Sequence, residues 1–308
     1  MMGGGKSRTF ASTEGLPMLR TKPWTPYLYL APVCLLLAFV FGYPLIAVFD
    51  FSFRRIRGAT GPFIGLENYR QIFKDEVFQQ AIVHNAQLLL AVPILVIVGI
   101  VLAVLLYERV RGWRIYRTVL FAPFIIAIPV IGVVFSNMLS LNGAVNEMLR
   151  AVGLGFLALD WLGSAQMALW SVMAIIIWHE VGFGVVLFLA RLLSLNEEIQ
   201  EAARIDGATW WQRLWFVTIP QLKDVTEFYA VVSVITMLAW VFPFVYVMTR
   251  GGPGNATQVM ELYIFNFAFR NSLPGIASAV AVILFLITLA LMIPLFQLRA
   301  RGEMEGAE

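Results

Sequence analysis

The chain has 308 residues, of which 60% are hydrophobic and 13% are charged, and its formal net charge is +3. Soluble globular domains carry roughly 45–50% apolar and about 25% charged residues, so the composition excludes an ordinary soluble enzyme and indicates an all-α polytopic membrane protein. The basic residues stand at the ends of apolar runs, which fits membrane topology better than nucleic-acid binding. The single cysteine, Cys34, excludes a disulfide framework and a cysteine-based metal site.

Six apolar segments are long enough to cross a bilayer as helices, which takes about 20 residues each. They cover residues 27–49, 82–107, 118–139, 168–190, 228–248 and 276–296. The first is too long for the core of a signal peptide and has no small-x-small cleavage pattern, so we expect an uncleaved helix. The sequence therefore predicts an N-terminal tail (1–26), a six-helix domain (27–298) and a C-terminal tail (299–308).

The distribution of basic residues predicts that both termini are cytoplasmic. With this orientation fourteen of the 22 Lys and Arg residues lie inside and eight lie outside, as the positive-inside rule requires. The first outer loop, with Arg54, Arg55 and Arg57, runs against the trend locally.

Prolines interrupt several of the predicted spans. At each one the simpler interpretation is an ordinary kink, and the alternative is a break whose freed carbonyl groups face a neighbour or a cavity. The positions are Pro32, Pro44, Pro93, Pro123, Pro129, Pro243 and Pro294.

The polar loop at about 194–223 has the chemistry of two short helices. Ser194 and Glu197 form the pattern of a capping box, and Thr209 and Gln212 form a second. Gly207 offers the left-handed backbone that ends a helix and reverses the chain. Pro220 is expected to stop the second helix.

This loop is longer than a plain connector between helices, which needs only about 2–8 residues. A well-made connector remains the plainer interpretation. Its length, its two capping boxes and its position on the predicted cytoplasmic face favour a docking site for a soluble partner.

Residues 201–208 read E-A-A-R-I-D-G-A, and Ile219-Pro220 follows. With these residues the chain resembles the permease subunits of binding-protein-dependent carbohydrate ABC importers, of the maltose and glycerol-3-phosphate type, in which this segment is the EAA loop. Further matching segments are 65–69 (GLENY), 142–146 (NGAVN), 249–253 (TRGGP) and 277–279 (ASA). Two departures are Ile219, where the family usually has Leu, and Asp224, where it usually has a second proline.

The resemblance implies that a coupling helix and its turn dock on the ATPase. It assigns this role to Glu201, Ala202, Ala203, Asp206 and Gly207. It also implies a dimeric ATP-binding subunit that carries ATP and Mg, a second homologous permease and an extracytoplasmic solute-binding protein. The chain itself would hold no cofactor or metal, would catalyse no reaction, and would move a sugar or polyol across the bacterial plasma membrane by alternating access.

Polar residues inside the predicted spans are candidates for a solute path, because such residues usually face a cavity or another helix. Trp178, His179 and Glu180, midway along the fourth span, are the first candidates. The alternative for His179 and Glu180 is interhelical bonding. Weaker candidates are Asn85, Gln87, Asn137, Ser233, Thr236 and Trp240.

Two rival functions stay open at this point. An intramembrane enzyme acting on a lipid-linked sugar would use His179 and Glu180 chemically, although the sequence has no acidic or histidine cluster beside them. An importer of another solute, such as an amino acid or an ion, is opposed only by the resemblance. Gly5-Lys6-Ser7 imitates the end of a phosphate-binding loop, but the glycine required five residues earlier is missing, so it predicts no nucleotide site.

Overall fold

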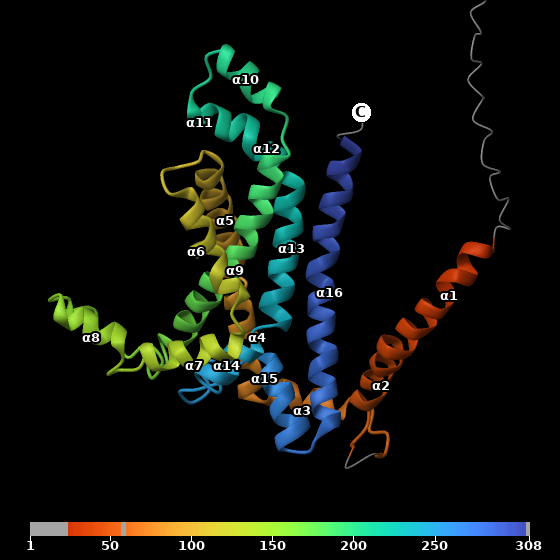
Figure 1. Ribbon diagram of the computed structural model, residues 1–308. Coiled ribbons are helices and arrows are strands. Elements are labelled where there is room, and N and C mark those ends of the chain that lie inside the picture. The colour runs from red at the N-terminus through yellow and green to blue at the C-terminus, as the bar shows by residue number, and fades with distance from the viewer. Residues whose placement is uncertain (1–23, 57–59, 306–308) are drawn as a thin grey trace, which may run out of the picture. The chain divides into compact units, whose positions relative to one another are not determined.

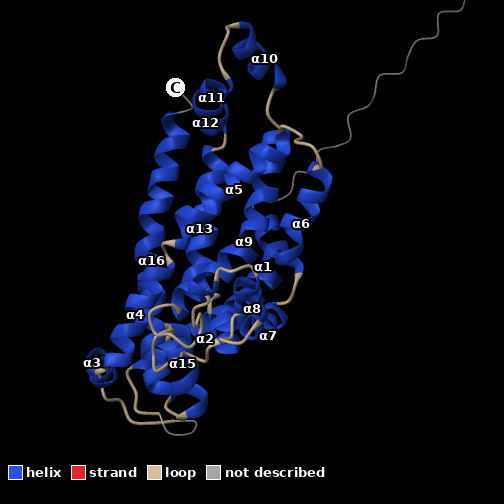
Figure 2. Ribbon diagram, turned by 90° about the vertical axis from the view of Figure 1, so that its left-hand side faces the viewer, coloured by secondary structure: helices blue, strands red, loops and turns tan. Residues whose placement is uncertain are grey.

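The computed structural model describes residues 24–56 and 60–305 (Figure 1). Gly5-Lys6-Ser7, Arg57 and most of the predicted N-terminal tail lie outside the described residues. The described chain is built of helices (Figure 2), with one isolated antiparallel bridge between Arg54 and Phe63. The predicted all-α class is confirmed.

The structure separates into two compact units, Met1–Ala47 and Val48–Glu308. In the first unit, α1 (Thr25–Leu37) continues through a π-helical turn, η1 (Ala38–Gly42), into α2 (Tyr43–Ser52), which enters the second unit. Together they form a candidate membrane span, Tyr27–Ser52, whose apolar window is not buried. Such a surface suits contact with lipid or with another membrane protein.

Three further candidate spans belong to the second unit. They are Glu76–Tyr107, which comprises α4 (Glu76–Leu88) and α5 (Ala91–Tyr107), then α9 (Ala168–Leu193), and the stretch Pro274–Pro294 of α16 (Pro274–Glu305). Because α16 continues to Glu305, most of the predicted C-terminal tail is helical.

The remaining two predicted spans are bent pairs. α6 (Trp113–Ile125) and α7 (Ile128–Met138) meet at 101°, and α13 (Lys223–Ala239) and α14 (Phe242–Met248) meet at 44°. The total of six holds when each pair counts as one span. Pro129 and Pro243 lie in the first turn of the second helix of each pair. Backbone N–H groups in a first turn have no partner within the helix, so proline costs no hydrogen bond there. An ordinary kink is therefore wrong at Pro129, where the chain turns through a right angle.

Small residues let the central helices approach closely. Gly99 on α5 faces the ring of Phe188, Gly184 on α9 faces the ring of Tyr229, and Gly182 lies against the backbone of Leu120 on α6. Close packing over small residues is how helices associate in a bilayer, where lipid weakens the hydrophobic driving force. The core around Phe188 and Tyr229 joins α5, α6, α9 and α13.

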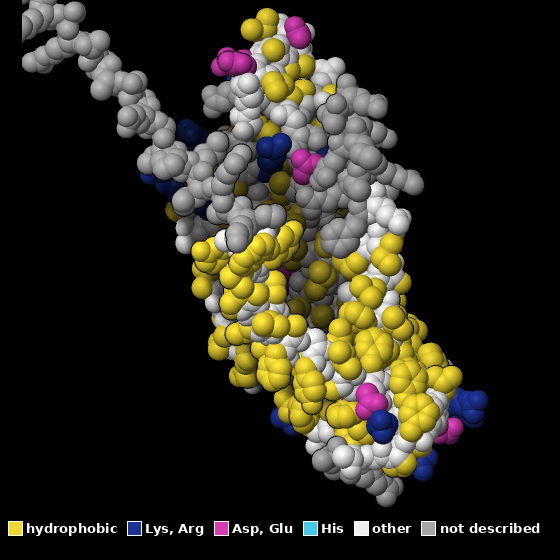
Figure 3. All heavy atoms as spheres, turned by 90° about the vertical axis from the view of Figure 1, so that its right-hand side faces the viewer, with side chains coloured by type: hydrophobic (Ala, Val, Ile, Leu, Met, Phe, Trp, Pro, Cys, Tyr) yellow, Lys and Arg dark blue, Asp and Glu magenta, His cyan; other side chains and the backbone are white. Residues whose placement is uncertain are grey.

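A second apolar cluster lies at the end of the unit that is farthest from the loop 194–223 (Figure 1). It joins α3 (Glu67–Lys74), α4, α15 (Met260–Phe265) and α16, and α15 continues into the π-helical turn η4 (Asn266–Arg270). α8 (Ala144–Ala151) and a 3-10 turn, η2 (Gly155–Leu157), lie toward the same end (Figure 1). On the face drawn in Figure 3, hydrophobic side chains cover the middle and charged ones gather toward the two ends, as a membrane protein requires.

Candidate functional site

The polar loop 194–223 projects beyond one end of the helices (Figures 1 and 2). It consists of α10 (Glu197–Ile205), α11 (Trp210–Arg213), a π-helical turn η3 (Leu214–Thr218) and α12 (Ile219–Gln221). Two bonds hold it to itself and to α9: Gln200 Nε2 donates to Thr218 Oγ1 at 3.3 Å, and Arg191 Nε donates to the carbonyl of Gln221 at 3.2 Å.

Of the two predicted capping boxes, one is confirmed and one is wrong. Thr209 accepts from the amide of Gln212, and the Gln212 side chain accepts from the amide of Thr209 at 2.7 Å. Ser194 instead ends α9, where its hydroxyl donates to the carbonyl of Arg191 at 2.7 Å. The cap of α10 is Asn196, whose side chain accepts from the amide of Glu198 at 2.9 Å. Because α9 extends to Leu193, Ser194 is its C-cap and is not free to begin α10. Asn196 takes that place, and Asn is as good an N-cap as Ser.

Gly207 reverses the chain as the sequence predicts, with a φ of +80°. The amide of Gly207 donates to the carbonyl of Arg204 and that of Ala208 to the carbonyl of Ala203, at 3.1 and 3.0 Å. This pair of bonds is a Schellman ending, which satisfies carbonyl groups that the helix end leaves unpaired.

Pro220 does not stop the second helix, contrary to prediction. The π-helical turn η3 passes directly into α12, and Pro220 stands in the first turn of that helix. The change of helix type at Thr218–Ile219 lets the chain continue through a residue that cannot donate a backbone bond.

The residues assigned to docking lie together on the projecting part of the loop. Glu201, Ala202, Asp206 and Gly207 are exposed, and Ala203 is half-buried. Beside them Ile205 is 86% exposed. Most of the residues assigned to docking are therefore accessible to a partner.

A cavity of about 580 Å³ opens at the break between α6 and α7. Four of the predicted path residues line it: His179, Glu180, Thr236 and Trp240. Phe124 and Phe183 also line it. Among its lining residues Glu180 is the one carboxylate, and none is Lys or Arg.

His179, which is buried, and Glu180, which is half-buried, form a pair at this cavity. His179 Nδ1 lies 2.9 Å from Glu180 Oε1, and its ring lies between those of Phe124 and Phe244. His179 Nε2 is buried and has no hydrogen-bond partner in the described chain. A buried polar atom without a partner is costly, and this nitrogen has almost no accessible surface, so it does not face the open space of the cavity.

The other five predicted path residues do not line the cavity; they are Trp178, Asn137, Ser233, Asn85 and Gln87. Trp178 packs edge-on against Phe135, with ring centroids 5.1 Å apart. Asn137 donates to the carbonyl of Val133, one turn earlier in its own helix, at 2.8 Å. Ser233 is buried on α13.

Sequence reasoning missed the aromatic wall of the cavity, Phe124 and Phe183. A signal was present in Pro123 and Pro129, which flank the break that exposes this wall. An aromatic face beside hydrogen-bonding side chains is suited to the apolar and hydroxyl faces of a sugar.

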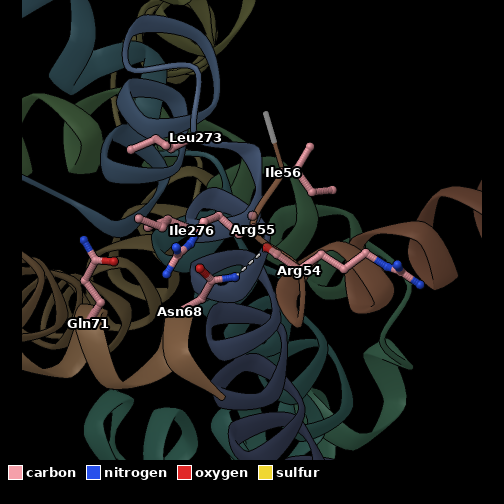
Figure 4. A pocket seen from close by; sticks show the side chains of 8 residues that line it. Arg54, Arg55, Ile56, Asn68, Gln71, Leu273 and Ile276 are labelled. Carbon is pink, nitrogen blue, oxygen red and sulfur yellow. Dashed lines mark hydrogen bonds between the residues drawn. The ribbon is translucent and has the colours of Figure 1, made fainter. Parts of the chain in front are cut away.

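A smaller pocket of about 200 Å³ lies on the opposite end of the unit from the loop, in the basic segment that the sequence predicts to be an outer loop (Figure 4). Asn68 Nδ2 donates to the carbonyl groups of Ser52 and Arg54, at 2.8 and 2.9 Å. Arg54 pairs with Asp50 at 2.7 Å, whereas Arg55 is directed toward Gln71 (Figure 4). Arg54 and Arg55, two of the arginines that run against the charge trend, thus belong to a segment whose backbone Asn68 holds.

Comparison with known proteins matches the chain to one family. The model of the family described as "binding-protein-dependent transport system inner membrane component" matches residues 74–302. The chain is 35% identical over 289 residues to the probable ABC transporter permease protein YurN of Bacillus subtilis (strain 168), covering 91% of this chain and 97% of that protein. It is 31% identical over 297 residues to the lactose transport system permease protein LacF of Rhizobium radiobacter, covering 95% and 99%.

Among solved structures, the chain is similar to a bacterial ABC transporter involved in the import of the acidic polysaccharide alginate. The TM-score is 0.79 at 24% identity, over 90% of this chain and 96% of that one. A second structure of a bacterial alginate ABC transporter, in complex with an alginate pentasaccharide-bound periplasmic protein, matches with the same TM-score at 23% identity, over 90% and 94%. At these identities the likeness establishes the fold.

Proposed function

Because the chain belongs to the family of binding-protein-dependent transport system inner membrane components, we propose that it is the transmembrane subunit of an ATP-driven importer for a sugar or related polyol. The solute crosses the plasma membrane of a bacterium by alternating access, and both termini face the cytoplasm. The names of relatives such as the lactose permease LacF support the solute class. The excess of basic residues on the predicted inner side supports the orientation.

The chain works in this proposal with three partners. A dimeric ATP-binding subunit hydrolyses ATP with Mg, a second homologous permease completes the translocation path, and an extracytoplasmic solute-binding protein delivers the solute. The solved complex of a related transporter with a periplasmic protein supports the last of these. The exposed apolar face of Tyr27–Ser52 gives the second permease, or lipid, a surface to cover.

The projecting loop is the proposed contact with the ATPase. Glu201 supplies a charge, Ala202 and Ala203 allow close approach, and the Asp206–Gly207 turn fixes the angle between α10 and α11. The Schellman ending and the capping box make this two-helix unit stiff. A stiff unit transmits the closure of an ATPase dimer to α9 and α13, which continue from its two ends.

The cavity at the α6–α7 break is the proposed part of the solute path. Glu180 provides a hydrogen-bonding carboxylate, and Phe124, Phe183 and Trp240 provide aromatic faces. Because the cavity holds a carboxylate and no cation, it favours an uncharged solute over an acidic one such as alginate. Trp178, Asn137 and Ser233 contribute only through the position of their helices.

The test is copurification and ATPase assay of the chain expressed with the subunits encoded beside it. Wild type is compared with the double variant Glu201→Lys, Gly207→Pro, since proline cannot adopt a positive φ. Glu147→Lys, on exposed α8, is the matched control. We expect the ATPase to copurify with wild type and the control, and to be lost or uncoupled from the binding protein in the double variant. Failure of any ATPase to associate with wild type would overturn the proposal.

A further inference from the structure

We propose that the junction between α5 and the α11–η3 segment binds one anionic phospholipid of the inner leaflet. An acyl chain occupies an apolar slot beside α5, and the headgroup lies at Arg204 and Arg213. This rests on the orientation proposed above, which places the loop 194–223 at the cytoplasmic surface.

The slot has a volume of about 340 Å³ and no charged residue in its lining. Ile97, Val101 and Leu105 of α5 form one wall, and Trp210, Trp211 and Trp215 form the other. Trp211 is 62% exposed and Trp215 is 59% exposed. The chain therefore leaves two large aromatic side chains uncovered in the apolar lining of the slot.

A polar pocket adjoins the slot and shares three of its lining residues, Val104, Trp210 and Leu214. This pocket adds Arg204, Arg213 and Glu108. Glu108 Oε1 accepts from Trp210 Nε1 at 3.3 Å and so orients the shared tryptophan. The Arg204 side chain has no hydrogen-bond or ion-pair partner among the described residues. An apolar slot that leads into a pocket with excess positive charge matches an amphiphile with an anionic headgroup.

The depth of the slot favours a lipid over the ATPase as its occupant. Ile97 lies ten residues before Tyr107, the last residue of α5, which corresponds to about 15 Å along a helix. α5 belongs to the candidate span Glu76–Tyr107, so this wall runs far into the hydrocarbon. A soluble subunit does not reach that depth, whereas an acyl chain does. Tryptophan is enriched at this boundary because its ring is apolar and its N–H is polar.

The experiment uses the complete transporter in nanodiscs and follows tryptophan fluorescence. A small fraction of brominated phosphatidylglycerol, or the same fraction of brominated phosphatidylcholine, replaces unlabelled phosphatidylcholine. We expect stronger quenching by the anionic lipid. Three of the nine tryptophans of this chain line the slot, so the excess amounts to at most about a third of the emission that this chain contributes.

Variants locate the effect. The triple change of Trp210, Trp211 and Trp215 to Phe should abolish the excess, and Arg204→Gln with Arg213→Gln should bring the two lipids to equal quenching. Trp170→Phe and Arg117→Gln, outside the slot, should keep the excess.

Three results would overturn the proposal: equal quenching by both lipids in wild type, an excess that survives the triple variant, and slot quenching that appears only after a partner protein is stripped away. The last would assign the slot to that protein. ATP-dependent uptake by the same samples is measured in parallel, so loss of lipid binding with uptake retained leaves the proposed function standing. Quenching of the chain alone decides the lipid site if no ATPase associates.

Discussion

Asn85 on α4 bonds to the start of α15, at Met260 and Glu261, with both ends of its carboxamide. Asn85 Oδ1 accepts from the amide of Met260 at 2.8 Å, and Asn85 Nδ2 donates to Glu261 Oε2 at 3.2 Å. The other carboxylate oxygen of Glu261 is buried without a hydrogen-bond partner in the described chain. Asn85, a weaker candidate for the solute path, therefore joins two helices instead.

This geometry predicts a pH-dependent stability. α15 lies outside the candidate spans, and burial raises the pKa of Glu261 to about 7 from 4.5. Between these pH values the folded state holds a proton that the unfolded state has lost, so stability falls as pH rises and levels off above about 7. Glu261→Gln keeps an acceptor for Asn85 and removes the charge. We expect it to raise the free energy of unfolding by roughly 1–3 kcal/mol at pH about 8, measured by unfolding in detergent.

The same substitution should change little at pH about 5, where Glu261 is already protonated in the folded state. Glu147→Gln, on the exposed face of α8, is the control and should leave the pH profile unchanged. A Glu261→Gln protein that is no more stable than wild type at the higher pH would show that the carboxylate finds a partner in solution.

A second prediction concerns the cap of α11. Thr209→Ala removes the side chain that accepts from the amide of Gln212, at a cost of about 1 kcal/mol. Thr209→Ser retains the hydroxyl and is the matched control. Hydrogen exchange of the amides at 210–213 should become several-fold faster in Thr209→Ala and stay near the wild-type rate in Thr209→Ser. Equal exchange in the two variants would mean that packing, and not the cap, holds α11.

The sequence was sufficient where one local interaction decides the structure. Gly207 and the Thr209–Gln212 box are confirmed because a turn and a cap depend on a few adjacent residues. The prediction that Ser194 caps α10 is wrong because two candidate caps, Ser194 and Asn196, lie within three residues, and the length of α9 decides between them. The right-angled break before Pro129 depends on the packing of α7 against α14, which lies more than a hundred residues away.

The solute cavity, too, could be predicted from the sequence only in part. Hydropathy identified Glu180, His179 and Trp240 as costly or unusual within spans, and these three line the cavity. Trp178 gives the same signal but is directed away from its neighbour His179, because adjacent residues of a helix point about 100° apart. Asn137 also gives it, but its side chain bonds to the backbone of its own helix. The hydrophobic pattern of α9 could not show which of its faces lines the cavity, since buried residues lie on several sides of the helix.

A third prediction tests the close contact of α9 with α6. A Cβ at Gly182 would overlap the carbonyl oxygen of Leu120, and backbone cannot move as a side chain can. Gly182→Ala should destabilise the protein by roughly 1–3 kcal/mol, seen as a lower midpoint of thermal unfolding. Gly42→Ala is the control, because a Cβ there meets nothing within 4 Å, and it should be neutral or slightly stabilising. Normal stability of Gly182→Ala would show that the two helices separate at little cost.

The last prediction tests whether the solute passes through the cavity at Glu180 or along α7 near Asn137. Glu180→Ala leaves His179 Nδ1 without its partner and removes the one carboxylate of the cavity. Loss of a charged hydrogen-bonding group costs about 1.5–3 kcal/mol, so we expect uptake into proteoliposomes to fall roughly tenfold or more while the ATPase still copurifies. Glu180→Gln should retain part of the uptake, since an amide still accepts a hydrogen bond. Asn137→Ala, whose side chain bonds to its own helix, should transport like wild type. Wild-type uptake by Glu180→Ala would remove this cavity from the path, and a defect in Asn137→Ala would move the path toward α7.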